Sequence, residues 1–476
     1  MGRAQAEPVA ARVRRVPRVA RVPRGVAPRA PRWHGWLLWA LMLATLPLVN
    51  PHIRSDGNEN YAYVRSIIID HDLRFDDEYA RGEDAFRAAM AGDVRLSPAG
   101  YRRNPARVGP SVLWTPFFLA GHVAAQMLQA RGQAVPADGY SWPYLWACAF
   151  GTALYAFLGL WFSYRMALRF AGPAAALLAT VVIWLASSLP VYVYFLPFHA
   201  HAIAMFSVAW FLWNWLKVRD GSDGRLRWLV WGLSGGLMAV TSDLNGLILI
   251  VACAEWLLRL FTPRQFVPTL TRGVIFAAGV ALTVLPDATI RGALEGSWFA
   301  TGYDRTMFSW RAPQLFAVAF STGHGAFSWT PVLLLAVAGL AWLVRRSPLP
   351  GAIVVLTSAV FYYVLAAYGG WHGYSSYGNR HLVALTPFFI FGLAALIDAV
   401  CGGGHRRRWL TARAVALSLI LWNAGFMLQW GTGLVPDRGP VDFTIVARNQ
   451  VTVVPRAAWD FLNRHFRQRD MLDPRP

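Results

Sequence analysis

The chain has few cysteines and lacks the short motifs that mark many nucleotide-dependent and zinc-dependent enzymes. Its three cysteines, Cys148, Cys253 and Cys401, lie far apart, in or at the end of apolar runs. That spacing fits neither a disulfide framework nor a cysteine metal site. The sequence contains no G-x-G-x-x-G fingerprint, Walker-type loop or H-E-x-x-H pair, and no internal repeat stands out. Nucleotide-driven chemistry therefore has no support in the sequence.

Acidic residues are also scarce, with 25 Asp and Glu against 45 Lys and Arg, a net charge of +20. In a soluble protein this excess would suggest a nucleic-acid partner. Here more than half of the basic residues fall in six segments that lie on one side of a membrane when spans are counted alternately. Those segments hold only three acidic residues, Glu7, Asp220 and Asp223. The charge therefore indicates topology under the positive-inside rule, and we expect no nucleic-acid partner.

Hydrophobic residues make up 56% of the chain and recur in long runs. A helix needs roughly 20 apolar residues to cross the hydrocarbon core of a bilayer. The sequence thus predicts an all-α integral membrane protein, a bundle of about eleven transmembrane helices with extracytoplasmic juxtamembrane helices. The expected spans are 33–50, 143–165, 173–189, 199–217, 227–242, 244–260, 272–290, 328–344, 350–368, 381–400 and 410–430.

The predicted topology divides the chain into three parts. Residues 1–32 form a basic, proline-punctuated tail, which we expect to be disordered and cytoplasmic. The membrane domain is expected at 33–430, with 51–142 as its first periplasmic loop, and 431–476 as a short periplasmic tail. Within that loop, 109–130 is long enough to span. A crossing there would invert every later basic loop, so we predict a helix along the outer membrane face.

An acid-rich stretch follows the first predicted span. Asp56 and Glu59 stand three residues apart before an apolar run, which is the pattern of a helix-capping box. A capped helix end would also hold a carboxylate rigidly at the membrane surface. A second acidic cluster, Asp70 to Tyr79, reads as a solvated surface segment, with a calcium site as the alternative.

A carboxylate at this place suits glycosyl transfer from a lipid-linked sugar. That reaction needs a base to take a proton from the acceptor hydroxyl, and Asp56 is the candidate. It also needs positive charge on the departing lipid phosphate, most effectively from arginine. Arg380, at the start of a predicted span, is the candidate for that charge, although it could instead snorkel to lipid headgroups. Arg102 and Arg103, just before 109–130, are further candidates for the phosphate.

Other polar and aromatic residues are expected to line the same pocket. The loop before Arg380 is rich in glycine and carries Trp371, His372, Tyr374 and Asn379. His324 lies between two glycines at another span entrance, where it could bind donor, acceptor or metal, or serve only in a turn. His199 and His201 fall on different helix faces, so joint chelation is not expected.

These segments resemble the GT-C glycosyltransferases, membrane enzymes that use polyprenyl-phosphate sugars. The order is similar to that of the protein O-mannosyltransferase and lipid A aminoarabinose transferase type. An acidic motif, "SDGNENYAY", follows the first span, and a surface helix, "VGPSVLWTPFF", comes next. "STGHGAFSWTPVLL" and "YGNRHLVALTPFFIFGLAAL" also resemble segments of such proteins. The likeness covers about 33–430, and the large soluble C-terminal domain of the family is absent from this sequence.

The resemblance implies an inverting transferase in the bacterial inner membrane, with its catalytic acid at Asp56. Many members have two adjacent acids, whereas here the next, Glu59, is a helical turn away. Some members bind a divalent cation near the lipid phosphate, but no equivalent ligand set is evident. The implied partners are a polyprenyl-phosphate sugar donor, a lipid, glycan or protein acceptor, and the membrane itself.

Two other functions remain open at the level of sequence. An O-antigen ligase or polymerase, acting on lipid-diphosphate glycans, would be expected to carry a longer arginine- and histidine-bearing late outer loop than 369–380. A transporter or flippase would be expected to bury ionisable groups within its spans and to show related halves. The sequence does not identify the sugar or the acceptor.

Overall fold

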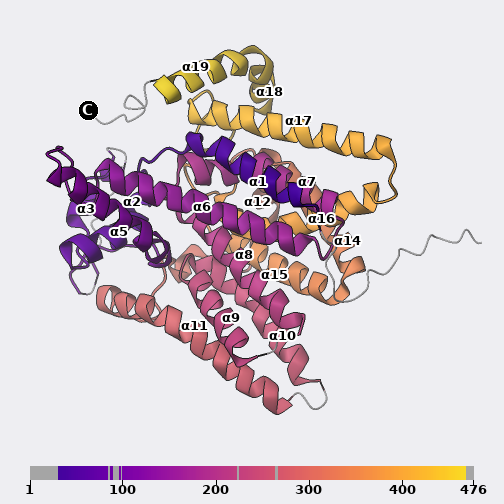
Figure 1. Cartoon of the computed structure of the whole chain (residues 1–476), viewed down its shortest axis with the longest axis horizontal. Helices are drawn as coiled ribbons and strands as arrows, with labels where there is room; N and C mark the ends of the chain where they lie inside the picture. The colour runs from indigo at the N-terminus through magenta and orange to yellow at the C-terminus, as the bar shows by residue number, and fades with distance from the viewer. Residues whose placement is uncertain are drawn as a thin grey trace, which may run out of the picture.

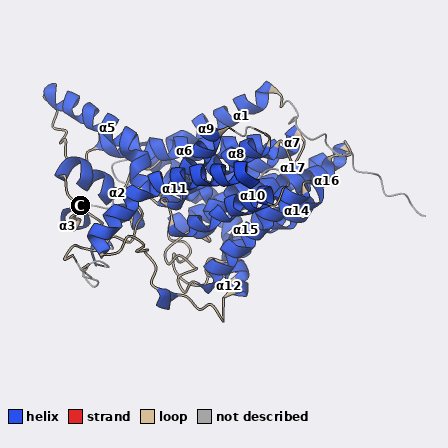
Figure 2. Ribbon diagram, turned by 90° about the horizontal axis from the view of Figure 1, so that it is seen from below, coloured by secondary structure: helices blue, strands red, loops and turns tan. Residues whose placement is uncertain are grey.

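The computed structural model describes residues 30–83, 86–88, 96–97, 99–221, 224–262 and 266–467. The predicted basic tail lies outside these residues except for its last three. The described part is helical, and its only β-type pairs are two isolated bridges, Leu96–Arg102 and Phe308–Tyr368. This confirms the predicted all-α fold (Figures 1 and 2).

The α-helices are α1 (Arg32–Thr45), α2 (Asp56–Arg65), α3 (Asp76–Ala80), α5 (Gly109–Ala130), α6 (Trp142–Ala167), α7 (Pro173–Ala186), α8 (Ala200–Arg219), α9 (Arg225–Ala239), α10 (Ile250–Leu260), α11 (Phe266–Glu295), α12 (Leu315–Phe320), α13 (Ala326–Trp329), α14 (Val332–Arg346), α15 (Pro348–Ala367), α16 (Thr386–Cys401), α17 (Arg406–Gly431), α18 (Phe443–Thr452) and α19 (Val454–Arg467). Short 3₁₀ or π segments connect them at η1 (Leu46–Leu48), η2 (Ser66–Asp70), η3 (Val191–Phe195), η4 (Asp243–Leu249), η5 (Arg305–Met307) and η6 (Arg380–Leu385).

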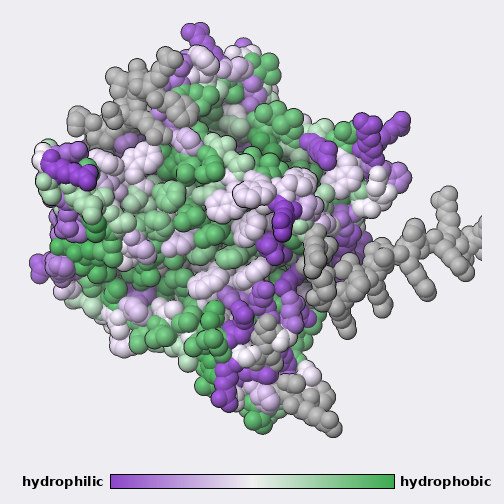
Figure 3. All heavy atoms as spheres, viewed as in Figure 1, coloured by the Kyte–Doolittle hydropathy of each residue, from purple (hydrophilic) through white to green (hydrophobic). Residues whose placement is uncertain are grey.

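Within the described residues, six helices are long and apolar enough to span a bilayer. They are α5, α6, α11, α15, α17 and the continuous helical segment Arg380–Cys401, which joins η6 to α16. Shorter apolar helices, such as α7, occupy other predicted spans. The chain is thus a multi-pass membrane protein. Hydrophobic residues cover most of the face in Figure 3, and hydrophilic residues gather toward its margins.

Helix α5 covers the segment predicted to lie along the membrane face. It packs against α6 and α2. By length and composition it qualifies as a span, so its surface position stays a prediction.

The central helices pack closely because small residues face one another. A side chain at Gly339 of α14 would collide with the backbone of Gly392 in α16, and one at Gly392 would collide with Ala336. Helices α9 and α11 approach each other in the same way, at Gly232 and Gly279. Small residues let transmembrane backbones approach closely, which strengthens van der Waals packing. This packing builds the rigid frame that carries the site.

The first loop folds into a compact unit beside that frame. Figure 1 shows α2, α3 and α5 together at one end of the molecule. A small hydrophobic cluster that includes Tyr63, Phe75 and Tyr79 holds the unit together. Arg107 then joins it to the helical frame, because its guanidinium pairs with Asp243 of η4 and with Asp287 of α11.

The second acidic cluster is solvated only in part, because Asp76 and Asp77 are exposed whereas Glu78 is buried. The Arg65 guanidinium donates to the carboxylates of Asp70, Asp77 and Glu78, and Glu78 is only 2% exposed. Ligand oxygens of the three acids lie within 4.8 Å of one another, a spacing that could hold a metal ion. Arg65 offsets only part of the negative charge of these acids and ties them to the end of α2, and the calcium site stays an open alternative.

The segment from 431 onward, predicted to be a short tail, contains two helices, α18 and α19. Helices α18 and α19 pack against the end of α17 and lie beyond it at the top of Figure 1. The His465 ring bonds the carbonyl oxygen of Pro47 at 2.8 Å, which ties α19 to the start of the chain.

Candidate active site

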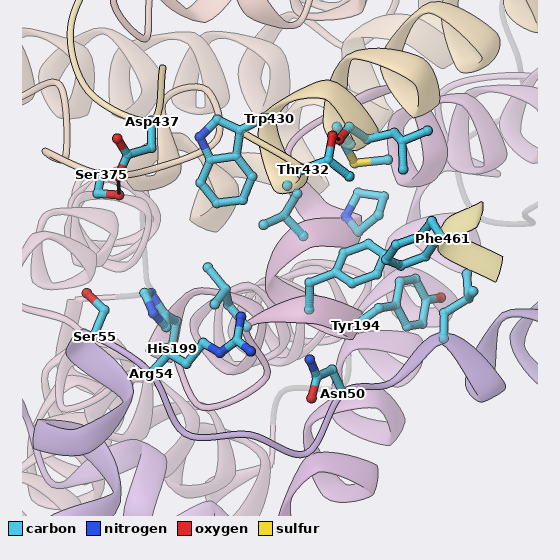
Figure 4. A pocket seen from close by; sticks show the side chains of 18 of the residues that line it. Asn50, Arg54, Ser55, Tyr194, His199, Ser375, Trp430, Thr432, Asp437 and Phe461 are labelled. Atoms are coloured by element: carbon cyan, nitrogen blue, oxygen red, sulfur yellow. Dashed lines mark hydrogen bonds between the residues drawn. The ribbon is translucent and has the colours of Figure 1, made fainter. Parts of the chain in front are cut away.

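A cavity of about 1080 Å³ lies between the first loop, the C-terminal ends of several helices and α19. Its lining falls into two groups. The charged end comprises Arg54, Ser55, Asp56, Glu59, Glu83, His199, Ser375, Asp437 and Arg438. The other end, here called the apolar end, is mainly hydrophobic and comprises Leu48, Leu185, Val191, Tyr194, Phe195, Leu196, Ile420, Met427, Leu428, Phe461 and Leu462. Thr45, which bonds the Tyr194 hydroxyl, and His465, which stacks on Phe461, add polar groups to its lining. Figure 4 shows Arg54, Ser55 and His199 at one side and Tyr194 and Phe461 at the other.

Asp56 lines the charged end and pairs with Arg380, which is not itself among the lining residues. Asp56 is the first residue of α2 and Arg380 the first of η6, yet Asp56 Oδ2 and an Arg380 terminal nitrogen lie 2.6 Å apart. The Arg380 side chain is 11% exposed, whereas that of Asp56 is 38% exposed and lines the cavity. The carboxylate therefore faces the cavity, with the guanidinium beside it.

The protonation states of the two acids differ because of this pairing. Burial alone would raise the pKa of Asp56, but the Arg380 guanidinium, with smaller contributions from His199 and His201, holds it well below its usual range. Burial and the nearby Asp56 charge raise the pKa of Glu59 to about 8, although Arg380 acts in the opposite direction. Near neutral pH the site thus holds an ionised Asp56 and a protonated Glu59.

The backbone of α2 is fixed by side chains that bond its ends and flanks. Asn60 donates to the Asp56 carbonyl at 2.7 Å, and Asn104 donates to the Glu59 carbonyl at 2.9 Å. The predicted capping box is wrong by one position, because Ser55 is the N-cap and the Asp56 carboxylate bonds no backbone N–H of the first turn. The Asp56 side chain therefore does not cap the helix and instead pairs with Arg380.

The glycine-rich loop encloses Arg380 tightly. Gly373 has φ +71, and a Cβ there would lie 2.9 Å from Arg380 Nε. Arg380 Nε is itself buried without a hydrogen-bond partner. The loop thus presses on one side of the guanidinium while Asp56 binds the other.

The structure places the other predicted pocket residues outside this cavity's lining. The Trp371 indole donates to Gln314, and Asn379 donates to the Trp371 carbonyl, so both brace the loop. Tyr374 is 56% exposed and its N–H donates to the His372 ring. The loop reaches the cavity through Ser375, whose hydroxyl donates to Asp437 at 2.5 Å.

His324 is buried rather than open to the cavity. Its ring stacks on Trp329 at a centroid distance of 4.8 Å. Burial, and secondarily the nearby His372, lowers the pKa of His324 to about 4, so the ring is neutral. Its predicted contact with a substrate or metal therefore remains a prediction.

Arg102 and Arg103 do not line the cavity either. Arg102 lies 3.3 Å from an Asp76 oxygen, and Arg103 donates to Glu295 at 2.8 Å. Both side chains are thus engaged on the surface of the first-loop unit. Their proposed role at the donor phosphate stays a prediction to which this geometry adds no support.

Several lining residues were missed by sequence reasoning. Arg54 and Glu83 are ordinary loop charges in the sequence, and no local pattern links them to Asp56. A weak signal existed for α19, since Phe461 and His465 are four residues apart and share a helix face. His199 was considered only as a metal ligand, whereas it lines the charged end and its ring centroid lies 6.1 Å from that of His201.

The described residues of the cavity lining hold no group of three acids or histidines placed to bind a metal ion. Arg380 already stands beside the Asp56 carboxylate as its counter-charge. In the described part of the chain, the one group of three acids or histidines close enough to hold a metal is the Arg65 cluster, away from the cavity lining.

No protein-family model and no curated protein matches the sequence. Among solved structures, the chain is similar to the archaeal oligosaccharyltransferase AglB from Archaeoglobus fulgidus, in complex with an inhibitory peptide and a dolichol-phosphate. The TM-score is 0.51 with 13% identity, over 83% of this chain and 58% of that one, so the chain spans less than two thirds of AglB.

A second similar structure is ArnT from Cupriavidus metallidurans, bound to undecaprenyl phosphate. It has a TM-score of 0.44 and 13% identity, over 91% of this chain and 77% of that one. At this identity a likeness shows architecture, and function must be argued from the site. The chain thus shares its overall fold with AglB, in keeping with the helical membrane bundle that the sequence predicted.

Proposed function

We propose that this protein transfers a sugar from a polyprenyl-phosphate donor to an acceptor hydroxyl, with inversion at the anomeric carbon. The observation that carries the proposal is the Asp56–Arg380 pair at 2.6 Å, in which Asp56 lines the charged end of a cavity whose other end is mainly apolar. A base and a phosphate-binding cation are the two groups that the reaction needs at one place.

The shape of the cavity fits an amphiphilic donor. The apolar end would take the first part of the polyprenyl chain, and the charged end would take the phosphate and sugar. Arg54 also lines the charged end and adds positive charge there. AglB was solved with a dolichol-phosphate, another lipid phosphate, which supports this class of donor.

In the proposed reaction the donor phosphate binds the Arg380 guanidinium in place of the Asp56 carboxylate. This exchange raises the pKa of Asp56 at the moment when a base is required, because its stabilising counter-charge is then shared. Asp56 accepts the proton of the acceptor hydroxyl while that oxygen attacks the anomeric carbon. The bond from that carbon to the phosphate oxygen breaks, and the lipid phosphate leaves with the bonding electrons.

Glu59 would support this chemistry by staying neutral. With a pKa of about 8, it adds no negative charge at neutral pH beside an anionic donor. Arg380 can then serve the phosphate rather than a second carboxylate.

The proposed location is the periplasmic face of a bacterial inner membrane, with a cytoplasmic N-terminus and a periplasmic C-terminus. The charge distribution of the loops supports this orientation. The membrane domain at 33–430 would supply the catalytic groups. Helix α19 adds cavity wall from the segment beyond it.

The alternative functions receive less support from the buried charges. Buried Glu255 is paired with Arg219 and Arg259, and Asp287 with Arg107. Paired charges of this kind hold helices together and are not evidence of an ion pathway. An O-antigen ligase or polymerase would use a lipid-diphosphate donor, so a transfer assay that compares monophosphate with diphosphate donors separates that function from the proposed one.

The test is an assay with the full-length protein in membrane vesicles. Radiolabelled polyprenyl-phosphate hexoses and pentoses would be compared with the corresponding diphosphates, with extracted glycolipids and membrane proteins as acceptors. We expect transfer from a monophosphate donor and its loss in Asp56→Asn. Transfer from diphosphate donors alone, or uptake of substrate without transfer, would contradict the proposal.

A further inference from the structure

The residue before Asp56 has an unusual backbone conformation. Ser55 has φ +51 and ψ −131, outside the regions that residues with a Cβ normally occupy. Such a conformation persists only where surrounding contacts enforce it. Since Ser55 leads directly into the first residue of α2, its backbone angles set the direction of the Asp56 side chain.

Glu83 supplies the contacts that enforce this conformation. Its Oε1 accepts the Ser55 N–H at 2.5 Å, and its Oε2 accepts from the Asn58 side-chain amide at 2.9 Å. The same Asn58 nitrogen donates to the Ser55 carbonyl at 3.0 Å. One carboxylate, 28 residues along the chain, thus bridges the N-cap residue of α2 and a side chain of its first turn.

Other contacts at the start of α2 limit how far the helix could shift if the Ser55 backbone changed. Gly57 packs against Phe198, where a Cβ would lie 3.0 Å from the Phe198 Cβ. The Ser55 hydroxyl donates to the Asp56 carboxylate at 3.2 Å. A change in the Ser55 backbone would therefore turn Asp56 relative to Arg380, while α2 stays against its neighbour.

The charge of Glu83 also suits its place. A carboxylate at a helix N-terminus interacts favourably with the helix dipole and with the unpaired N–H groups there. Glu83 lines the cavity in the same charged end as Asp56, so it acts within the site rather than behind it.

We infer that Glu83 is a positioning residue that holds Ser55 in its left-handed conformation and thereby aims the Asp56 carboxylate at Arg380. The inference rests on the proposed function for its catalytic consequence. The structural part of the inference, that Glu83 fixes the Ser55 backbone, can be tested without measuring activity.

The experiment compares Glu83→Ala and Glu83→Gln with the wild-type protein in vesicles. The alanine variant loses both bonds, and we expect kcat for sugar transfer to fall about 100-fold with the donor KM within about twofold. The glutamine variant keeps an oxygen for the Ser55 N–H, so we expect its kcat to be about tenfold higher than that of Glu83→Ala. With Asp56 less well paired in the free enzyme, the acid limb of the kcat/KM profile should move to higher pH in Glu83→Ala.

Asp304→Ala is the matched control. The Asp304 carboxylate accepts the Thr306 N–H at 2.8 Å at the start of η5, and it does not line the cavity. This variant also removes a carboxylate from a helix start, and it should transfer sugar like the wild type.

Amide hydrogen exchange provides a readout that does not depend on activity. Exchange across residues 53–60 should accelerate in Glu83→Ala and stay unchanged in Asp304→Ala. Unchanged exchange there, or an unchanged kcat in a protein that transfers sugar, would overturn the inference. If the wild-type protein transfers no sugar from any donor, the proposed function fails, and the exchange result alone decides whether Glu83 holds Ser55.

Discussion

The two ends of the cavity are built in different ways. At the charged end, Asp56 pairs with Arg380, and Glu83 bonds the neighbouring Ser55 N–H, so short polar contacts leave little freedom. At the apolar end, side chains from η1, η3, α17 and α19 meet through van der Waals packing, as Phe195 and Phe461 do at a ring distance of 6.0 Å. Polar geometry is sensitive to small displacements, whereas an apolar surface tolerates changes of shape.

This difference predicts how substitutions divide. Changes at the charged end should lower kcat, since they alter the groups that act in the transition state. Changes at the apolar end should raise the KM for a lipid donor, since they remove contacts that bound substrate and transition state share. Three substitutions test this division, and a fourth prediction tests the charge of Glu59 through the pH dependence of donor binding.

The largest effect is expected from Asp56→Asn. Asparagine preserves the shape of the side chain but cannot accept the acceptor proton, and general-base catalysis contributes roughly 10²- to 10⁴-fold. We expect kcat to fall about 1000-fold, measured as transfer of radiolabelled sugar in vesicles. A loss of less than about threefold would remove Asp56 as the base.

The next effect is expected from Arg380→Lys. Lysine keeps the charge but cannot form the two parallel hydrogen bonds of a guanidinium. Its narrower side chain also leaves empty the space that the guanidinium fills beside Gly373. We expect kcat/KM for the donor to fall about 100-fold. Arg102→Lys, which changes an arginine that pairs with Asp76 rather than with Asp56, is the control. Equal losses in the two variants would place the phosphate elsewhere.

At the apolar end, Phe461→Ala should raise the donor KM about tenfold with kcat little changed. The expected size follows from removing most of a phenyl ring from contact with lipid, worth about 1.5–3 kcal/mol at full burial. Trp459→Ala is the matched control, since Trp459 belongs to the same helix but is 66% exposed and does not line the cavity. A fall in kcat at unchanged KM in Phe461→Ala would break the proposed division between the two ends.

The smallest effect concerns pH. Because the pKa of Glu59 is raised to about 8, this residue becomes anionic above that pH and repels the donor phosphate. We expect the donor KM to rise about fivefold between pH 7 and pH 9 in the wild type, and to stay flat in Glu59→Gln. A KM that rises equally in both proteins would show that another group is responsible.

The same raised pKa has a consequence for stability. The folded state binds the Glu59 proton more tightly than the unfolded state does, so this contribution is present below pH 4.5 and is lost as pH rises through about 8. Glu59→Gln should therefore flatten the fall in thermal stability across that range, which a melting series in detergent would measure.

The sequence predicted the helical membrane fold and the meeting of Asp56 with Arg380. Both residues lie next to predicted spans, and the charges of the short loops placed them on one side of the membrane. Alternation of spans is enough to bring such residues to one face, even when they are more than 300 residues apart in the sequence.

The walls of the cavity could not be predicted in the same way. The direction of each side chain in the loop before Arg380 depends on positive φ angles at Gly373, Tyr374 and Gly378, which composition does not give. For this reason Ser375 faces the cavity while Trp371 braces the loop.

Long-range polar contacts were equally hidden. The N-cap of α2 is completed by Glu83 rather than by the local pattern of Asp56 and Glu59. Helix α19 reaches the cavity because His465 bonds Pro47, more than 400 residues earlier in the chain. Neither contact leaves a periodic pattern in the sequence.

The central claim is that Asp56 and Arg380 act as one catalytic unit. A double-mutant cycle of Asp56→Asn, Arg380→Gln and the double variant, measured as kcat/KM for sugar transfer, tests it most directly. If the two residues act together, the double variant should transfer sugar within about threefold of the slower single variant, as groups of one catalytic unit do. Losses that multiply in full would show that the two side chains act independently and would contradict the account.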